Sequence, residues 1–271
     1  MLAPGSVKPF VKWTGGKQKM VGRLMPYLPV YQKYHEPFMK YHEPFMGGAA
    51  LFFHVQPRRA VLTDLNAELV NAFQVVRDDV EHVLEELRVY QQRHSAEHYR
   101  EIRALTPRSM YSFARAARFI YLNKTCFNGL YRVNRQNQFN VPMGSYVNPR
   151  ICDEATIRAA SAALQWTNIF CASYQETFAF AGAGDFFYVD PPYDSAFNGY
   201  TADGTFNQQR LAETLWRAAN NNVTWMLSNS DTPQIRSLYS AFRIVELSRQ
   251  GTMCSDPTKR QSVRELLIMN Y

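Results

Sequence analysis

One stretch decides the fold class of this 271-residue chain: FFYVDPPY, residues Phe186 to Tyr193. Its first four residues form a short apolar run, which is typical of a buried strand, and Asp190 follows at once. Pro191 and Pro192 then fix the backbone and remove two amide donors, so the strand ends here. In open α/β sheets, ligands bind at the carboxyl ends of strands, so we expect a functional loop. A turn that the prolines only stiffen is the alternative interpretation.

The loop offers hydrogen-bond acceptors beside an aromatic ring. Asp190 and the carbonyl of Pro191 can accept the two hydrogens of an amino group on a flat heterocycle, and Tyr193 can stack on the ring. Such an amine is a poor nucleophile because its lone pair is delocalised. Acceptors on both N–H bonds stabilise the positive charge that grows as nitrogen attacks an electrophile. The chain has no histidine after His98, so electrostatic activation is the simplest mechanism here.

The rest of the chain alternates between strand and helix patterns. We expect strands at 60–63, where Asp64 follows, and at 169–172, 186–189, 224–228, 243–247 and 265–269. Helices are expected at 68–90, 113–122, 208–220 and 232–239. Strands separated by helices predict an α/β fold, with a mostly parallel sheet, helices on both of its faces and a smaller helical insertion.

Positive charge is concentrated in the middle of the chain. Lysine and arginine together number 30 against 23 acidic residues, and 22 of the 30 are arginine. No acidic residue lies between Glu101 and Asp153, whereas this stretch holds Arg103, Arg108, Arg115, Arg118, Lys124, Arg132, Arg135 and Arg150. A polyanion is a natural partner, because neutralised phosphates release their counterions. A solvated basic face is the alternative.

Several classes of protein are disfavoured. No run approaches eighteen consecutive apolar residues, and the first residues carry prolines and lysines where a signal peptide needs an apolar core. We therefore expect a soluble, cytoplasmic protein without a membrane partner. The cysteines at 126, 152, 171 and 254 lie far apart. This spacing suggests neither a zinc site nor a disulfide framework, so we expect reduced thiols and no metal.

A perfect tandem copy lies ahead of the strand expected at 60–63. KYHEPFM occupies residues 33–39 and again residues 40–46. A copy of odd length cannot continue a strand in register, because side chains alternate with a period of two. We assign the strand position to Tyr41 to Met46, which leads into Gly47 and Gly48, and we treat the first copy as loop.

Two further motifs have a residue composition suited to a nucleoside ligand. FVKWTGGK, residues 10–17, joins an aromatic platform, a glycine pair and a cation, but it does not fit the phosphate-binding loop pattern. A flexible turn is the alternative. EPFMGG, residues 43–48, is followed about twenty residues later by Asp64, as in sites where an acid holds a ribose hydroxyl. Asp64 as the cap of a helix that begins near Asn66 is the competing interpretation.

Taken in order, KWTGGK, EPFMGG, NKTCFNGLYRVNRQNQFNVPMGSY and DPPY resemble the Dam-type DNA adenine-N6 methyltransferases. The resemblance extends from Phe10 to Tyr271 and includes SNSD at 228–231 and the tail TKRQSVRELL. It implies a Rossmann-like methyltransferase sheet. It also implies a catalytic domain at 1–65 and 151–271, a helix at 66–95 packed on it, and a DNA-recognition domain at 96–150.

The resemblance implies an S-adenosylmethionine-dependent, adenine-specific enzyme. The positions that match the family's cofactor-binding residues are Trp13, Lys17, Glu43, Phe45, Gly47, Asp64 and Asp190, with Asp64 on the ribose. Those that match the catalytic loop are Asp190, Pro191, Pro192 and Tyr193. The extra copy of KYHEPFM departs from the family pattern and is an insertion.

The resemblance also implies double-stranded DNA as the partner and a monomeric enzyme that flips adenine out of the helix, at GATC sites. Phe127 and Asn128 match the residues that fill the space of the extruded base, and Arg132 matches the arginine that reads guanine. A second set, which is Lys12, Pro142, Lys259 and Arg260, is assigned to further DNA contacts. Bacteria or phages are the expected source.

Two other functions stay open at this point. The same amine pocket suits N4 of cytosine, and a DNA-binding module without catalysis would also explain the basic segment. The sequence leaves open whether a restriction nuclease accompanies the activity.

Overall fold

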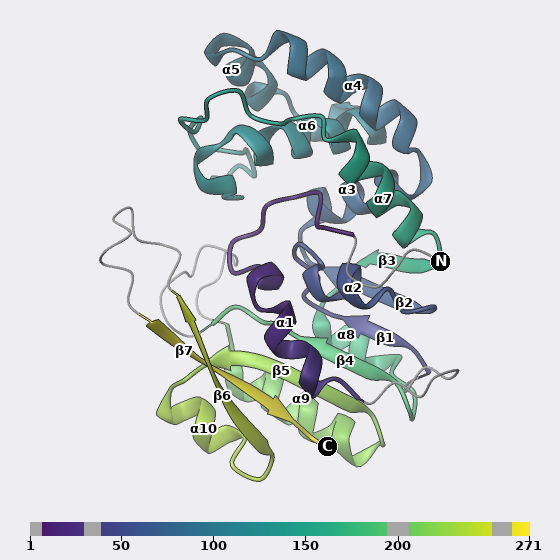
Figure 1. Ribbon diagram of the computed structural model, residues 1–271, viewed down its shortest axis with the longest axis vertical. Coiled ribbons are helices and arrows are strands. Elements are labelled where there is room, and N and C mark those ends of the chain that lie inside the picture. The colour runs from purple at the N-terminus through teal and green to yellow at the C-terminus, as the bar shows by residue number, and fades with distance from the viewer. Residues whose placement is uncertain (1–6, 30–38, 194–205, 251–261) are drawn as a thin grey trace. The chain divides into compact units, whose positions relative to one another are not determined.

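The computed structural model describes residues 7–29, 39–193, 206–250 and 262–271 (Figure 1). The chain divides into two compact units: residues 1–21 with 46–171, and residues 22–45 with 172–271. These units reflect packing alone. The expected division into a catalytic and a DNA-recognition domain concerns function and stays a prediction.

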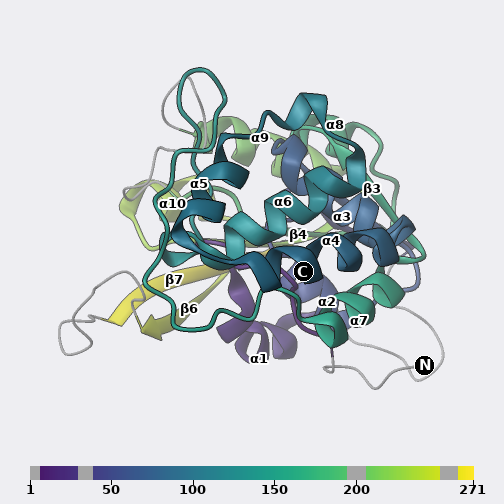
Figure 2. The same cartoon turned by 90° about the horizontal axis from the view of Figure 1, so that it is seen from above.

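The first unit combines two strands with a group of helices. Its elements are η1 (Lys17–Lys19), α2 (Ala50–Val55), β2 (Ala60–Asp64), α3 (Ala67–Asp78), α4 (Val80–Arg93), α5 (Ala96–Ala104), η3 (Pro107–Ser109), α6 (Ser112–Thr125), η4 (Phe127–Gly129), α7 (Glu154–Leu164) and β3 (Thr167–Cys171). Strands β2 and β3 are parallel, with Asp64 opposite Cys171 at their ends. In Figure 2, α4 and α5 lie beside α6.

The expected single helix over 68–90 is wrong. The structure divides it into α3 and α4 at Asp79, whose backbone leaves the helical region at φ −148° and ψ 54°. Its carboxylate lies 2.7 Å from Nδ1 of His82 instead of bonding the backbone of α4. Short polar side chains compete with helical hydrogen bonding in this way, and apolar spacing continues across the break.

The described part of the second unit contains five strands. Its elements are α1 (Val21–Leu24), η2 (Met25–Tyr27), β1 (Tyr41–Glu43), α8 (Tyr174–Ala179), β4 (Phe186–Val189), α9 (Gln208–Asn220), β5 (Thr224–Ser230), α10 (Pro233–Leu238), β6 (Arg243–Gln250) and β7 (Ser262–Met269). Strands β1, β4 and β5 are parallel, whereas β7 runs antiparallel to both β5 and β6.

The order of strands across the sheet is β3-β2-β1-β4-β5-β7-β6. Within the described residues, β2 with β3, β1 with β4 and β4 with β5 pair in parallel, and the antiparallel pairs are those of β7 with β5 and β6, so the predicted α/β class with a mostly parallel sheet is confirmed. In the second unit, Val189 of β4 pairs with Leu227 of β5. Both strands therefore end at the same edge, which brings the DPPY segment and the SNSD segment to that edge.

The core of the second unit explains its boundaries. Phe187, Trp225 and Leu215 are fully buried in one apolar cluster that β4, β5 and α9 share. The run 186–189 is buried throughout, and it stops where Asp190 and the two prolines begin. The predicted bounds of β4 and α9 are confirmed, since apolar periodicity and flanking polar residues agree there.

The second copy of the repeat forms β1, as predicted, but the strand ends at Glu43 and does not extend to Met46, because the chain turns at Pro44. Tyr41, His42 and Glu43 are all buried, and Tyr41 pairs with Phe186. The first copy lies outside the described residues except for Met39, whose backbone N–H donates to the carbonyl of Gly184 at 2.9 Å.

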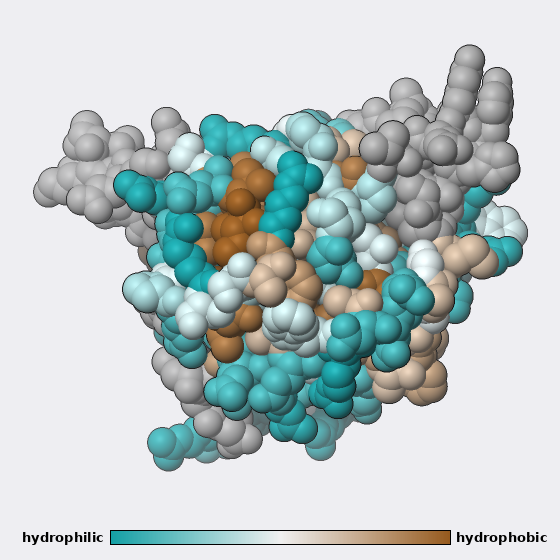
Figure 3. Space-filling view, turned by 90° about the horizontal axis from the view of Figure 1, so that it is seen from below, coloured by the Kyte–Doolittle hydropathy of each residue, from teal (hydrophilic) through white to brown (hydrophobic). Residues whose placement is uncertain are grey.

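The surface carries both hydrophobic and hydrophilic residues. Figure 3 shows one face of the molecule, on which hydrophobic residues gather and hydrophilic residues surround them. Among the residues that the structure describes, no helix has both the length and the apolar character needed to cross a membrane.

His42 gives a prediction for stability. Its ring stacks on Phe187 at 4.1 Å, and Nε2 lies 3.1 Å from the buried carboxylate of Asp185. Burial lowers the pKa of His42 below its ordinary value, although Asp185 acts in the opposite direction. The unfolded chain therefore takes up the proton first as the pH falls through about 6.5, which destabilises the fold by up to about 1.4 kcal/mol per pH unit.

We expect His42→Gln to reduce this loss of unfolding free energy between pH 7 and pH 5, measured by urea denaturation. His82→Gln is the control, because Asp79 raises the pKa of the exposed His82. Because His82 stabilises the fold as the pH falls, the His82→Gln variant should lose more unfolding free energy between pH 7 and pH 5 than the wild type. An unchanged slope in the His42 variant would contradict the assignment.

Candidate functional site

The loop after β4 lies where the sequence predicts it. Pro191 is buried, and Asp190, Pro192 and Tyr193 are half-buried. Just before them, the hydroxyl of Tyr188 lies 3.0 Å from Oγ of Ser228, at the neighbouring strand end. Complete burial raises the pKa of Tyr188 well above its ordinary value, and Asp190 acts in the same direction. Tyr188 therefore stays neutral beneath an acceptor-rich loop.

Two more predicted cofactor residues belong to the second unit. Glu43, at the end of β1, is buried and accepts a hydrogen bond from the hydroxyl of Tyr41 at 2.5 Å. Phe45 packs on Tyr174, with ring centroids 5.4 Å apart, and contacts Phe206 edge-on at 5.6 Å. Glu43 thus ends a strand two residues before Phe45, and a carboxylate together with an aromatic ring suits a polar ligand with an apolar part.

In the first unit, three predicted cofactor residues lie together. Gly47 has φ +46°, and a Cβ atom there would lie 2.6 Å from Cδ1 of Trp13. Its backbone N–H donates to Oδ2 of Asp64 at 3.1 Å. Glycine is required, because the chain passes against the indole ring in a conformation that other residues rarely adopt. Trp13, Gly47 and Asp64 therefore form one cluster.

Asp64 is not the cap of the following helix. Asn66 caps α3, since its side chain accepts from the N–H groups of Glu68 and Leu69. Asp64 accepts from Asn66 through Oδ1 at 2.9 Å, in addition to its bond with Gly47. Burial raises the pKa of Asp64, while the backbone donors act to lower it. The carboxylate is thus held by the backbone at a strand end.

Lys17, the fourth cofactor prediction in this unit, is buried at 5% exposure. Its Nζ donates to the carbonyl of Gly15 at 3.1 Å, within the TGGK turn. A buried ammonium group needs acceptors around it, so the turn is built around this cation.

The predicted DNA-contact residue Lys12 is fixed by Asn123. The side chain of Asn123 accepts from the backbone N–H of Lys12 and donates to its carbonyl, both at 2.7 Å. Nζ of Lys12 donates to the carbonyl of Lys124 and lies 3.8 Å from the ring centre of Tyr146. The N-terminal segment is thereby tied to the end of α6.

The turn after α6 presents an aromatic side chain. Phe127 is 50% exposed, and its N–H donates to the carbonyl of Pro142 at 2.9 Å. Asn128 has φ +54° and Gly129 has φ +64°, where a Cβ atom would meet Lys12 at 2.6 Å. This tight turn brings Lys12, Phe127 and Pro142 together in one part of the first unit.

Arg132 follows on an exposed part of the same segment. Nε donates to Oδ1 of Asn140 at 2.7 Å, which orients the guanidinium group. Lys259 and Arg260, the other predicted contacts, lie outside the described residues.

Some of the positive charge in the basic segment is structural. Arg118 is 5% exposed and donates to the carbonyls of Ile102 and Arg103, both at 2.9 Å. Arg115 forms an ion pair with Glu68 at 2.6 Å. Arg108, Arg132, Arg135 and Arg150 remain exposed. The charge available to a polyanion is therefore smaller than the sequence count indicates.

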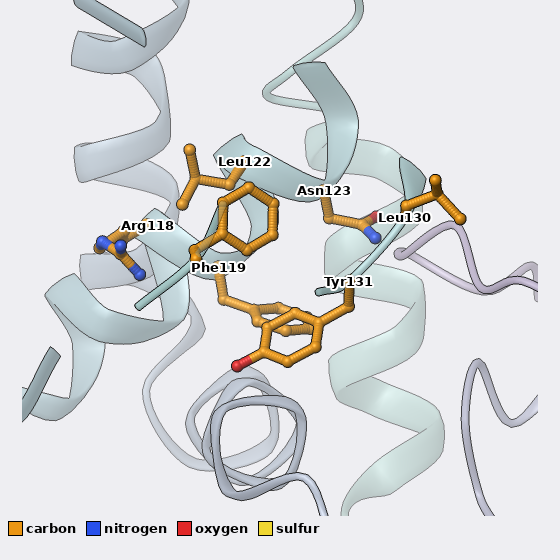
Figure 4. A pocket seen from close by; sticks show the side chains of 7 residues that line it. Arg118, Phe119, Leu122, Asn123, Leu130 and Tyr131 are labelled. Atoms are coloured by element: carbon orange, nitrogen blue, oxygen red, sulfur yellow. The ribbon is translucent and has the colours of Figure 1, made fainter. Parts of the chain in front are cut away.

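A small pocket in the first unit lies between α6 and the segment that follows it (Figure 4). Its lining consists of Arg118, Phe119, Leu122, Asn123, Leu130, Tyr131 and Phe139. None of the predicted site residues lines it. The ring of Tyr131, which lines the pocket, also stacks on Trp13, with ring centroids 6.4 Å apart. The pocket therefore belongs to the packing between the FVKWTGGK motif and the NKTCFNGLYR stretch.

Sequence reasoning missed three residues with clear roles in positioning. Asn123 holds Lys12, and Tyr131 packs on Trp13. Gln208 donates to the carbonyl of Pro192 at 2.9 Å. Asn123 and Tyr131 lie within the NKTCFNGLYR stretch, so that motif is the signal that marks them. Within the described residues, Cys126, Cys152 and Cys171 are free thiols, and no cluster of metal-ligating side chains is present.

Comparisons with known proteins agree with the motifs. A family model described as "D12 class N6 adenine-specific DNA methyltransferase" matches residues 13–253. The "Type II methyltransferase M1.LlaDCHI" of Lactococcus lactis subsp. cremoris is 37% identical, over 98% of this chain and 96% of that protein. The "DNA adenine methylase" of Haemophilus influenzae is 30% identical, over 97% and 93% respectively.

The Gly47 contact gives a second prediction. We expect Gly47→Ala to lower the unfolding free energy by about 1–3 kcal/mol, because the new methyl group overlaps Trp13 and strains a positive φ. Gly22→Ala is the matched control, since Gly22 is in α1 with no atom within 4 Å of the added carbon. Urea denaturation of both variants checks this, and equal stabilities would refute the close approach.

Proposed function

Because the chain belongs to the D12 class N6 adenine-specific DNA methyltransferase family, we propose that it methylates N6 of adenine in double-stranded DNA, at GATC. The methyl group comes from S-adenosylmethionine. The observation that carries the proposal is the strand-end loop Asp190–Tyr193, which has acceptors and an aromatic ring but no donors from its two prolines.

In the proposed reaction, the N6 lone pair attacks the methyl carbon, and the carbon–sulfur bond breaks as the carbon–nitrogen bond forms. The electron pair stays on sulfur, which leaves as S-adenosylhomocysteine. Asp190 and the carbonyl of Pro191 accept hydrogen bonds from the two N–H groups and stabilise the positive charge on nitrogen, while Tyr193 stacks on the base. One proton of the methylated ammonium then passes to water.

The residues assigned to the cofactor suit its chemistry. In the first unit, Asp64 offers carboxylate oxygens to ribose hydroxyls, and Gly47 lacks a side chain beside Trp13. In the second unit, Glu43 and Phe45 provide a carboxylate and an apolar ring. S-Adenosylmethionine combines a ribose, a flat base and a positive sulfonium, so carboxylates and aromatic rings are appropriate partners.

Base flipping is part of the proposal. N6 of a paired adenine cannot meet a methyl donor in line, so the base must leave the helix. We assign the filling of the vacated space to Phe127 and Asn128, since Phe127 is exposed on a constrained turn. An aromatic side chain that costs free energy in water is useful between bases.

The remaining assignments are also proposals. Lys12, Pro142, Lys259 and Arg260 contact DNA near the target, and the protein acts as a cytoplasmic monomer in a bacterium or phage. Relatives include proteins named Type II methyltransferase and others named DNA adenine methylase. A role beside a restriction nuclease and a solitary role are both compatible with these names.

A direct test uses methyl-labelled S-adenosylmethionine and duplex DNA with or without GATC. We expect label in N6-methyladenine for GATC duplexes, and a loss of at least about a hundredfold in Asp190→Ala, because the acceptor of the reacting amine is removed. Nucleoside analysis identifies the product. Label in N4-methylcytosine would favour an enzyme that methylates cytosine, and DNA binding without any label would favour a non-catalytic DNA-binding module.

The site preference rests on Arg132. We expect Arg132→Ala to lower kcat/KM on GATC about tenfold or more, because a forked contact to guanine contributes about 1–3 kcal/mol of discrimination. On duplexes altered at that guanine, kcat/KM should fall less, so the preference for GATC becomes weaker. Arg135→Ala, a neighbouring exposed arginine, is the control and should weaken all duplexes equally. Equal losses for Arg132→Ala would mean a phosphate contact.

A further inference from the structure

The DPPY loop is tied to a helix through a carbonyl group. Pro191 and Pro192 have no N–H, so their carbonyls are the only backbone groups with which they can form hydrogen bonds. Nε2 of Gln208, the first residue of α9, donates to the carbonyl of Pro192 at 2.9 Å. This bond fixes the loop one residue beyond the carbonyl assigned to the reacting amine.

A second amide continues the connection. Nδ2 of Asn229, near the end of β5, donates to Oε1 of Gln208 at 3.0 Å. Oδ1 of Asn229 in turn accepts the backbone N–H of Ser230 at 2.8 Å. Gln208 is 3% exposed and Asn229 is fully buried. The amide chain, defined as Pro192, Gln208, Asn229 and Ser230, thus joins the loop after β4 to α9 and β5.

The two ends of the amide chain fix its direction. The N–H of Ser230 can only donate, and the carbonyl of Pro192 can only accept. Each amide between them must therefore accept on the Ser230 side and donate on the Pro192 side. If Gln208 were rotated by half a turn, its Oε1 would face the carbonyl of Pro192, and two buried acceptors would repel each other. The nitrogen and the oxygen of both side-chain amides have a partner, and a buried network with its polar atoms paired is rigid.

We propose that Gln208 and Asn229 are positioning residues for methyl transfer, which act through the carbonyl of Pro192 on the geometry of Asp190 and Pro191. This inference rests on the function proposed above. Neither amide touches the substrate in this assignment. Since a misplacement of about 1 Å costs up to about a hundredfold in rate, loss of the bond to Pro192 should lower kcat while binding is kept.

The variant Gln208→Glu tests the direction of the amide chain. An ionised carboxylate places an oxygen against the carbonyl of Pro192, whereas a protonated carboxyl group can donate to it. Burial favours the protonated form and raises the pKa of the new carboxyl group, so the neutral form becomes accessible as the pH falls toward about 6. Relative to wild type at each pH, we expect kcat about tenfold lower at pH 8 and within about threefold at pH 6, with KM unchanged.

The matched control is Gln209→Glu, which makes the same charge change one residue along α9 at an exposed position. Its kcat relative to wild type should stay constant with pH. Gln208→Ala should lower kcat by a factor that does not depend on pH, because alanine neither donates nor titrates. A flat ratio for Gln208→Glu, or a change in KM alone, would overturn the inference.

Asn229→Asp provides a second variant if Gln208→Glu does not fold. Its ionised carboxylate faces Oε1 of Gln208, so its kcat should recover toward low pH in the same manner. Absence of recovery in a folded Asn229→Asp also counts against the amide chain. Wild-type protein that transfers no methyl group to GATC DNA would refute the proposed function itself, whereas an active wild type with flat variant ratios refutes only the positioning role.

Discussion

The absence of amide hydrogens at Pro191 and Pro192 is the constraint on which the candidate site depends. At these two residues the backbone can form hydrogen bonds only through its carbonyls. The buried run of β4 provides the packing, and Gln208 provides the donor to Pro192. The same absence makes the loop rich in acceptors, which is what an amine nucleophile requires. One covalent feature therefore explains both how the loop is held and what it can stabilise.

A comparable principle applies in the first unit, where Asp64 ends β2. Its carboxylate is held by backbone N–H groups of Gly47 and Asn66, so the acid is oriented without a basic side chain. The glycine that donates must also pass against Trp13, which leaves no space for a Cβ atom. In both units, then, a parallel strand ends in an acid whose surroundings restrict the backbone. Within each unit, parallel strands end at a common edge, where ligands of open α/β sheets bind.

The sequence predicts best where local signals agree. The bounds of β4 and α9 follow from an apolar run that ends at Asp190 and from regular helical spacing. The break at Asp79 escapes prediction because Val76 and Val80 preserve the helical pattern across it. The burial of Arg118 escapes it because its acceptors, the carbonyls of Ile102 and Arg103, lie on another helix. Charge counts and periodicity contain no information about such distant partners.

The tandem repeat shows how one residue can select between two identical segments. Either copy of KYHEPFM could supply the buried Tyr-His-Glu of β1, but only the second is followed by Gly47. The first copy is followed by Lys40, whose side chain could not occupy the position of Gly47 beside Trp13. Seven extra residues in a connection cost little, because closure entropy grows only with the logarithm of length, about 0.6 kcal/mol per doubling. The strain of a side chain at the Gly47 position is larger, so it fixes the second copy in the strand.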